Sequence, residues 1–398
     1  MNQTLFNTLL HPIESILNSI SPSIDQQSDS QKLFFADFVE KLIFGYIYQV
    51  SSLRNLSLEL ETNLTCQELG FSATPFSTLK DGFSRFESKS FKQLFETVLA
   101  QTDLSKVPCI QELGLCRVID GSLFPTLLSI NWTNYRERKN AFKLHLSFEL
   151  NRMIPTEFWV GKGNSSERKF LEEVLKTGIT YIADRGYFSF GLADKVLKAE
   201  AYFVMRAKDN LLYEVVESCL INLAQLPKCF RQVTDEIIIF SNDEKQNKLR
   251  LITFEVAGSY FRLVTNRFDL STLNVIILYA YRWQIELFFK FMKRTMKGIH
   301  LMNHSQNGVE IQFYVLMVTA VLMMKLKQAS QETEEDGEKK EVEKEKREEK
   351  SVNSSEWIKD IGKIFYKSWK ISKNWLLIVK NSLTQIVDYE LLRLLNSY

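Results

Sequence analysis

Residues 279–293 read YAYRWQIELFFKFMK, and they carry the most informative pattern in this chain. The surrounding segment, Ser271 to Lys297, contains neither Gly nor Pro, opens on Ser and Thr and stops before Gly298. Ser and Thr commonly cap helix N-termini, and Gly commonly follows helix C-termini. The segment therefore predicts one long helix.

On that helix, one carboxylate lies among cations. At roughly 100° per residue, Glu286 shares a narrow stripe with Tyr279, Arg282, Lys290 and Lys293, beside a buried apolar face. A lone Glu among bases suits a site that binds both a divalent cation and a phosphate. A solvated face with Glu–Lys pairs one turn apart is the alternative that these residue types leave open.

Four of these residues form a recognisable signature. Tyr279, Arg282, Glu286 and Lys293 reproduce the pattern Tyr-x2-Arg-x3-Glu-x6-Lys. In this the chain resembles one group of bacterial insertion-sequence DDE transposases, the YREK or IS-four type. The resemblance implies two further catalytic aspartates upstream, each at the end of a β-strand.

Two aspartates meet that expectation. Asp120 and Asp184 each follow a short apolar run, so each is predicted at a strand C-terminus, where α/β sheets present ligand-binding residues. The stretches at 184–187 and 206–208 also resemble the same family. One strand-end Asp is usually a turn residue, so it is the set with Glu286 that predicts a site. His145 is expected to be a strand residue near the site rather than a ligand.

The order of predicted elements defines the fold. Strands are expected at 115–124, about 124–130 and 141–150, followed by a helix at 167–176, a strand at 179–184, a helix at 189–198 and a strand at 201–206. Three antiparallel strands followed by alternating strands and helices resemble a ribonuclease-H-like α/β fold. The segment between Asp184 and Glu286 is too long for one helix and strand, so we expect a β-rich insertion at about 209–266.

The whole chain is expected to have four parts. They are a helical, DNA-end-binding domain at 1–105, a ribonuclease-H-like catalytic domain at 106–327, a charged linker at 328–355 and a helical tail at 356–398. A turn and helix at 72–86 could form a helix-turn-helix that reads a DNA end, with plain helical packing as the alternative. The tail could serve packing or dimerisation.

Composition sets limits on location and partners. The net charge of the 398 residues is only +2, but the run 331–350 is acidic, and the mildly basic remainder permits nucleic-acid binding. Five cysteines without a C-x-x-C pair indicate neither a disulfide framework nor a zinc ribbon. The N-terminus lacks a signal-peptide pattern, and the apolar stretch 313–324 is too short to span a bilayer. We expect a nucleoid-associated cytoplasmic protein with no membrane partner.

The resulting hypothesis is an enzyme. It would bind the terminal inverted repeats of its insertion sequence, cut the double-stranded DNA and join the ends to a target by a cut-and-paste route. Asp120, Asp184 and Glu286 would be both the catalytic residues and the ligands of two Mg²⁺ ions, with Mn²⁺ as a substitute. A ribonuclease-H-like nuclease without strand transfer and a catalytically silent DNA-binding relic are the alternatives.

The DNA contacts come from the resemblance and from charge. The resemblance implies that Tyr279, Arg282 and Lys293 contact phosphates, and that the second strand is cut through a hairpin. A homodimer is expected in the complex that pairs the DNA ends. The other predicted DNA contacts are Lys290, Trp283, Arg185, Arg206 and Lys208.

Overall fold

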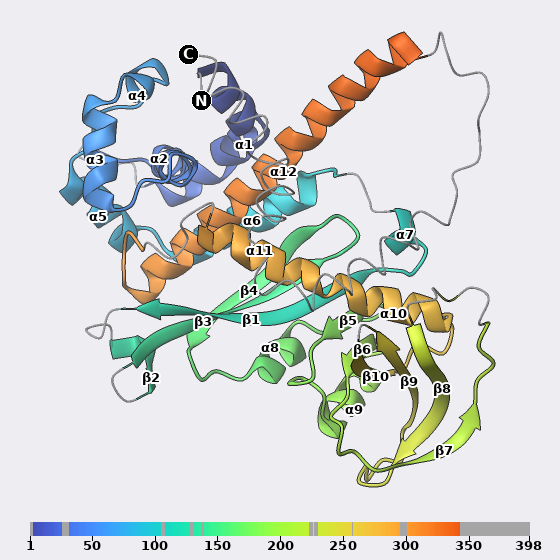
Figure 1. Cartoon of the computed structure of the whole chain (residues 1–398). Helices are drawn as coiled ribbons and strands as arrows, with labels where there is room; N and C mark the ends of the chain where they lie inside the picture. Colours follow the sequence, from blue (N-terminus) through green and yellow to red (C-terminus); the bar gives the residue numbers. More distant parts are fainter. Residues whose placement is uncertain are drawn as a thin grey trace.

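The computed structural model describes residues 3–25, 32–104, 108–126, 131–136, 139–222, 226, 230–256, 258–294 and 301–342 (Figure 1). They form a mixed α/β fold with helices gathered at one end of a large mixed sheet and a strongly curved group of strands at the other (Figure 1). The second half of the charged run and the whole predicted tail, 343–398, lie outside the described residues.

The helices and strands of the described residues have the following bounds. The helices are α1 (Gln3–Ile24), α2 (Phe35–Ile47), α3 (Leu53–Thr62), α4 (Leu64–Glu68), α5 (Phe76–Arg85), α6 (Ser88–Gln101), α7 (Pro108–Gln111), α8 (Glu167–Glu173), α9 (Phe190–Lys198), α10 (Thr272–Tyr281), α11 (Trp283–Arg294) and α12 (Gln306–Val342). The strands are β1 (Cys116–Thr126), β2 (Asn134–Arg136), β3 (Lys139–Glu149), β4 (Ile154–Lys162), β5 (Thr180–Ala183), β6 (Tyr202–Arg206), β7 (Tyr213–Ser218), β8 (Phe230–Phe240), β9 (Lys248–Val256) and β10 (Ser259–Thr265).

The helical region, α1 to α6, packs around the apolar half of α12. Asn307 at the start of α12 donates through Nδ2 to the carbonyls of Phe83 and Phe86, each at 2.9 Å. Further along, the Tyr46 hydroxyl donates to the Gln312 carbonyl at 3.1 Å. The same helix packs against β4, and one buried apolar cluster runs from the N-terminal helices into the sheet. Helix α12 therefore joins the two regions.

The apolar part of α12 is longer than the sequence predicted. Residues Gln306–Leu326 are long and apolar enough to cross a membrane by length and composition, and 67% of that window is buried inside the fold. Val315, Met317 and Val321 are fully buried. The segment is a core helix, and the helix continues through Val342 into the charged run.

The sheet contains three antiparallel strands next to two parallel ones. Its order is β2-β3-β1-β5-β6-β10-β9-β8-β7, with β4 paired to β3. Strand β1 runs antiparallel to β3 and parallel to β5, and β6 is parallel to β5. The prediction of a strand at 124–130 is wrong in part, because β1 itself continues to Thr126. Residues 127–130 lie outside the described residues.

The third antiparallel strand, β4, was missed in the sequence. Pro155 lies near its start, opposite Phe148, where the pairing of β3 and β4 shifts register. Pro cannot donate to a strand ladder and is confined to strand starts, edges and bulges. It therefore weakened the strand signal of the residues that follow.

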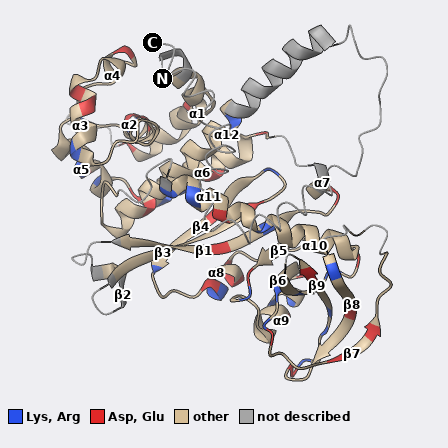
Figure 2. Ribbon diagram, in the orientation of Figure 1, with Lys and Arg blue, Asp and Glu red and all other residues tan. Residues whose placement is uncertain are grey.

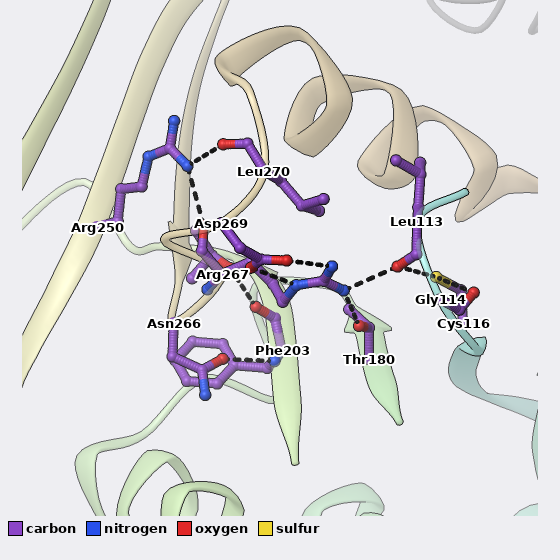
Figure 3. Close-up of polar contacts among 11 residues, drawn as sticks. Leu113, Gly114, Cys116, Thr180, Phe203, Arg250, Asn266, Arg267, Asp269 and Leu270 are labelled. Carbon is purple, nitrogen blue, oxygen red and sulfur yellow. Dashed lines mark hydrogen bonds and ion pairs between the residues drawn. The ribbon is translucent and has the colours of Figure 1, made fainter. Parts of the chain in front are cut away.

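The inserted strands extend the main sheet. Strand β10 pairs antiparallel with β6, and β9, β8 and β7 follow it in order. Arg250 on β9 donates to both oxygens of Asp235, at 2.8 and 2.5 Å. It also donates to the carbonyls of Arg267 and Leu270 (Figure 3). Thr272, at the start of α10, donates to Asp235 at 2.6 Å. This buried pair fixes α10 to the inserted strands.

A second guanidinium continues the network toward β5. Arg267 donates to the Thr180 hydroxyl at 2.6 Å, to the Leu113 carbonyl at 3.0 Å and to both oxygens of Asp269 (Figure 3). Thr180 is the first residue of β5. The segment that leads into α10 is thus hydrogen-bonded to β5, the strand that precedes Asp184.

The predicted single helix from Ser271 to Lys297 is interrupted. Helix α10 ends at Tyr281 and α11 begins at Trp283. The Arg282 N–H donates to the Tyr279 carbonyl, three residues back, at 3.1 Å, which tightens the turn. Arg282 keeps a helical backbone, so the two helices follow one another along the sheet (Figure 1). Residues 295–297 lie outside the described residues.

Candidate active site

The two predicted aspartates lie on neighbouring parallel strands. Asp184 directly follows β5, as predicted. Asp120 lies within β1 and not at its end, because β3 pairs with β1 as far as Thr126, whereas β5 pairs only as far as Val118. Asp120 therefore lies just past the end of the β5 pairing, at the same edge as Asp184.

Backbone amides hold both aspartates. The Gly121 N–H donates to Asp120 Oδ1 at 2.8 Å, and the Gly186 N–H donates to Asp184 Oδ1 at 2.7 Å. Each bond fixes one carboxylate oxygen and leaves the other available to a ligand.

Helix α11 brings the third carboxylate to β1. Glu286 lies in its first turn, and Arg282 Nη2 lies 2.9 Å from Glu286 Oε1. Lys293, two turns further on, donates to the Ser122 hydroxyl at 2.7 Å and to the Leu123 carbonyl at 2.9 Å. Figure 2 shows basic segments of α11 beside the acidic segment of β1. The stripe predicted on the helix thus faces the strand that carries Asp120.

The carboxylates influence one another. Burial raises the pKa of Asp120 to about 7; the Gly121 N–H and Arg282 oppose that rise, and the negative charges of Asp184 and Glu286 add to it. Neighbouring negative charges favour protonation of a carboxylate unless a cation lies among them. In the chain as described, the guanidinium of Arg282 supplies that positive charge.

The donor chemistry suits a hard divalent cation, since Mg²⁺ prefers carboxylate oxygens. As the side chains stand, no three His, Cys, Asp or Glu residues within the described ranges converge closely enough to hold a metal ion. The Arg282–Glu286 ion pair occupies one of the candidate ligands. A bound cation would therefore compete with Arg282 for the charge of this carboxylate.

The predicted DNA contacts fall into two groups. Tyr279 and Arg282 adjoin the carboxylates: Tyr279 is buried, and the Arg282 guanidinium lies 5.8 Å from the centre of its ring. Lys290 lies 4.9 Å from the centre of the Trp283 ring, and both residues belong to α11. With Lys293, these residues lie along α10 and α11, and α11 packs on β1.

The remaining predicted contacts surround the strand ends. Arg206 donates to the Tyr260 carbonyl at 3.1 Å and lies over the Phe261 ring. Arg185 lies 3.5 Å from Asp209, and Lys208 is exposed. Arg206 and Arg185 are held by protein groups, so their phosphate contacts would have to compete with these interactions.

His145 is a buried strand residue, as expected. Its Nε2 lies 2.8 Å from the Ser165 hydroxyl, and its ring stacks on Trp159 with centroids 5.3 Å apart. Burial, with Lys143 as a second cause, lowers the pKa of His145 to about 4. It is therefore neutral at physiological pH.

Two residues near the aspartates were not predicted as site residues, although Tyr187 lies in the stretch 184–187 that resembles the family. Glu167 follows Ser166, whose hydroxyl caps α8, so it reads as an ordinary acidic residue in the first turn of a helix. Tyr187 reads as a core aromatic, and its ring is buried. Only the assembled sheet shows that both adjoin Asp120 and Asp184.

Comparisons with known proteins agree on a family. The model of the transposase DDE domain matches residues 112–323. The chain is 26% identical over 216 residues to a putative transposase, y4zB, of Sinorhizobium fredii, over 53% of this chain and 60% of that protein. It is 24% identical over 194 residues to a probable transposase for insertion sequence element IS5377 of Geobacillus stearothermophilus, over 48% and 51%.

A third relative is the transposase for insertion sequence element IS231B of Bacillus thuringiensis, 23% identical over 302 residues, over 58% of this chain and 61% of that protein. The matches thus span between about half and three-fifths of each relative's length. The family model covers more than half of this chain and includes both aspartates and Glu286. The chain belongs to the family of DDE-domain transposases.

Proposed function

We propose that this protein is an insertion-sequence transposase of the YREK group with a ribonuclease-H-like catalytic core. It would bind the inverted repeats of its element, cut the DNA ends and join them to a target. The observation that carries the proposal is the packing of α11, which bears Glu286, on β1, beside the edge where β1 and β5 present Asp120 and Asp184.

The reaction asks little of the protein beyond charge and position. Strand cleavage and strand transfer are both in-line displacements at phosphorus, with water and a 3′-hydroxyl as the respective nucleophiles. Asp120, Asp184 and Glu286 would hold two Mg²⁺ ions, or Mn²⁺, which supply Lewis-acid activation of the attacking and leaving oxygens. No separate general base is needed.

The basic residues of α10 and α11 would orient the DNA. Arg282 is paired with Glu286, so its release from that carboxylate would free a guanidinium for a phosphate beside the cut. Lys293 lies over β1 two to three residues past Asp120, at Ser122 and Leu123. Tyr279 packs beneath Arg282 and limits where its side chain can go.

The test combines cleavage with binding. Asp120→Asn, Asp184→Asn and Glu286→Gln should each abolish cutting of an element end in Mg²⁺ and leave binding of that end largely intact. Their effects should not add, because the residues act as a unit. Asp194→Asn on α9, which removes a half-buried acid paired with Lys198, is the control and should cut normally.

Other outcomes identify the alternatives. Cutting without joining of the 3′-ends to a target would indicate a nuclease, and end binding without any cutting would indicate a silent relic. The proposal also includes a homodimer that pairs two ends and a hairpin route for the second strand. A hairpin would be detected as a covalently closed end on a denaturing gel.

A further inference from the structure

A fourth carboxylate lies between the two segments that carry the aspartates. An ideal Cβ built on Gly121, the residue after Asp120, would lie 3.2 Å from Glu167 Oε1. A Cβ built on Gly186 would lie 3.8 Å from Glu167 Oε2 and 3.1 Å from Asp184 Oδ1. The two glycines thus leave the space into which the Glu167 side chain extends.

The start of α8 is fixed in that place from two sides. Lys143 on β3 donates to Glu167 Oε1 at 2.9 Å. The next residue, Arg168, donates through Nε to the carbonyls of Gly186 and Tyr187, at 3.2 and 3.0 Å. The position of Glu167 is therefore tied to the loop that follows Asp184.

A buried hydroxyl beside these carboxylates has no partner. Tyr187 is fully buried, and among the described residues its hydroxyl finds no hydrogen-bond partner. After burial itself, the charges of Asp120, Glu167 and Asp184 are the largest causes that raise the pKa of Tyr187. The Tyr187 N–H also donates to the Asp184 carbonyl at 3.3 Å, so the residue lies beside the segment that carries Asp184. A buried donor without an acceptor is destabilising, so a ligand at this point would be favoured.

We propose that Glu167 is a fourth carboxylate of the divalent-cation site. We also propose that the Tyr187 hydroxyl is a positioning group, which donates a hydrogen bond to an oxygen atom at that site when the cation is bound. The inference rests on the proposed function. Glu167 adds negative charge at the cation, and Lys143, paired with it, offsets part of that charge. In this arrangement Lys143 weakens cation binding and Glu167 strengthens it.

A purely structural ion pair would behave differently. If Glu167 and Lys143 only join α8 to β3, removing either one should destabilise the protein to a similar extent and leave cation affinity unchanged. If Glu167 faces the cation, Glu167→Gln and Lys143→Met should change cation affinity in opposite directions. The direction in which Lys143→Met changes cation affinity therefore distinguishes a purely structural ion pair from a Glu167 that faces the cation.

The experiment titrates Mn²⁺ into the full-length protein without DNA and counts free Mn²⁺ by electron paramagnetic resonance. Glu167→Gln should weaken binding on the order of tenfold or more, as loss of a supporting group at a metal site does. Lys143→Met should tighten it. Glu172→Gln is the matched control: Glu172 lies on the same helix, pairs with Lys195 at 2.6 Å and is similarly exposed, at 32% against 30%. It should leave binding unchanged.

Tyr187→Phe supplies an independent measurement. Without cation, its melting temperature should equal or exceed that of the unmodified protein, because an unpaired buried hydroxyl is lost. The rise in melting temperature on adding Mn²⁺ should shrink. A rise that matches the unmodified protein would overturn the role of Tyr187.

The Asp120→Asn variant separates failure of this inference from failure of the proposed function. If Asp120→Asn loses Mn²⁺ binding while Glu167→Gln and Lys143→Met bind normally, Glu167 is structural and the three-carboxylate site stands. If Asp120→Asn also binds Mn²⁺ normally, the proposed cation site itself is wrong.

Discussion

Arg282 Nη2 lies 2.9 Å from Glu286 Oε1, at the residue where α10 gives way to α11. The same guanidinium lowers the pKa of Asp120. A protein cation thus lies among the carboxylates that we assign to a metal. The two cations compete for the same negative charge, which gives the first prediction.

Arg282→Gln should bind Mn²⁺ more tightly than the unmodified protein in the absence of DNA, by several-fold. Removing a positive charge next to Glu286 and Asp120 lowers the repulsion that an entering dication meets. The same variant should bind the element's end more weakly. Mn²⁺ titration and a gel shift measure the two effects.

Arg54→Gln on α3 removes the same charge from the helical region and serves as the control for the Mn²⁺ titration. If Arg282→Gln binds Mn²⁺ less tightly than this control, Arg282 supports Glu286 and does not compete with the cation.

Lys293→Met should weaken DNA binding and flatten the dependence of log K on log salt by about one unit, since one phosphate contact is lost. The substitution also removes the hydrogen bonds to Ser122 and Leu123, so some thermal stability should be lost as well. A titration of the element's end at several salt concentrations gives the slope. A lower melting temperature with an unchanged slope would limit Lys293 to anchoring α11 on β1.

The buried pair of Arg250 and Asp235 should be costly to break from one side. Their side chains are 6% and 0% exposed. Asp235→Leu leaves the Arg250 charge unpaired and should lower the free energy of unfolding by about 3–5 kcal/mol. Urea denaturation followed by circular dichroism measures the change.

The double variant Arg250→Met with Asp235→Leu should lose less stability than Asp235→Leu alone, because no buried charge is then left uncompensated. A double variant that is less stable than either single variant would show that the bonds from Arg250 to the Arg267 and Leu270 carbonyls matter more than the charge.

His145 should make the protein less stable in acid. Its pKa is lowered to about 4 in the folded protein from an ordinary value of 6.5. The unfolded chain therefore takes up a proton first as the pH falls, and stability is lost between about pH 6.5 and pH 4. The loss from this residue should reach about 2–3 kcal/mol at the acid end of that window.

The measurement compares urea midpoints at pH 7 and pH 4.5 for the unmodified protein and for His145→Gln, whose amide can still reach the Ser165 hydroxyl. The variant should lose less stability across that interval. Equal losses would assign the acid sensitivity to other groups.

Sequence patterns predict the positions and contacts of residues that depend on segments close to them in the chain. The helical spacing of Arg282 and Glu286 predicts their contact, and the apolar run before Asp184 predicts its place after β5. Asp120 was predicted at a strand end because its apolar run stops there. The strand continues because β3, from a distant segment, pairs with it as far as Thr126. Tertiary pairing overrides the local pattern in such cases.

The other differences have the same origin. The strand around Pro155 was hidden because the partner strand tolerates a register shift that local sequence does not show. Glu167 has the pattern of a helix N-terminus, and nothing within that pattern tells a capping acid from one that faces Asp120 and Asp184. The network of Arg267 with Leu113 and Thr180 joins three segments that no local pattern could have linked.

The packing of helix α12 limits how segments can be exchanged between related transposases. The N-terminal helices pack on Asn307 and Gln312, which follow them by some two hundred residues in the chain. A chimera that replaced residues 1–105 alone would pair foreign helices with the original α12 and would leave mismatched surfaces in its core. A workable exchange would have to replace the first turns of α12 together with the N-terminal helices, although the two segments lie far apart in the chain.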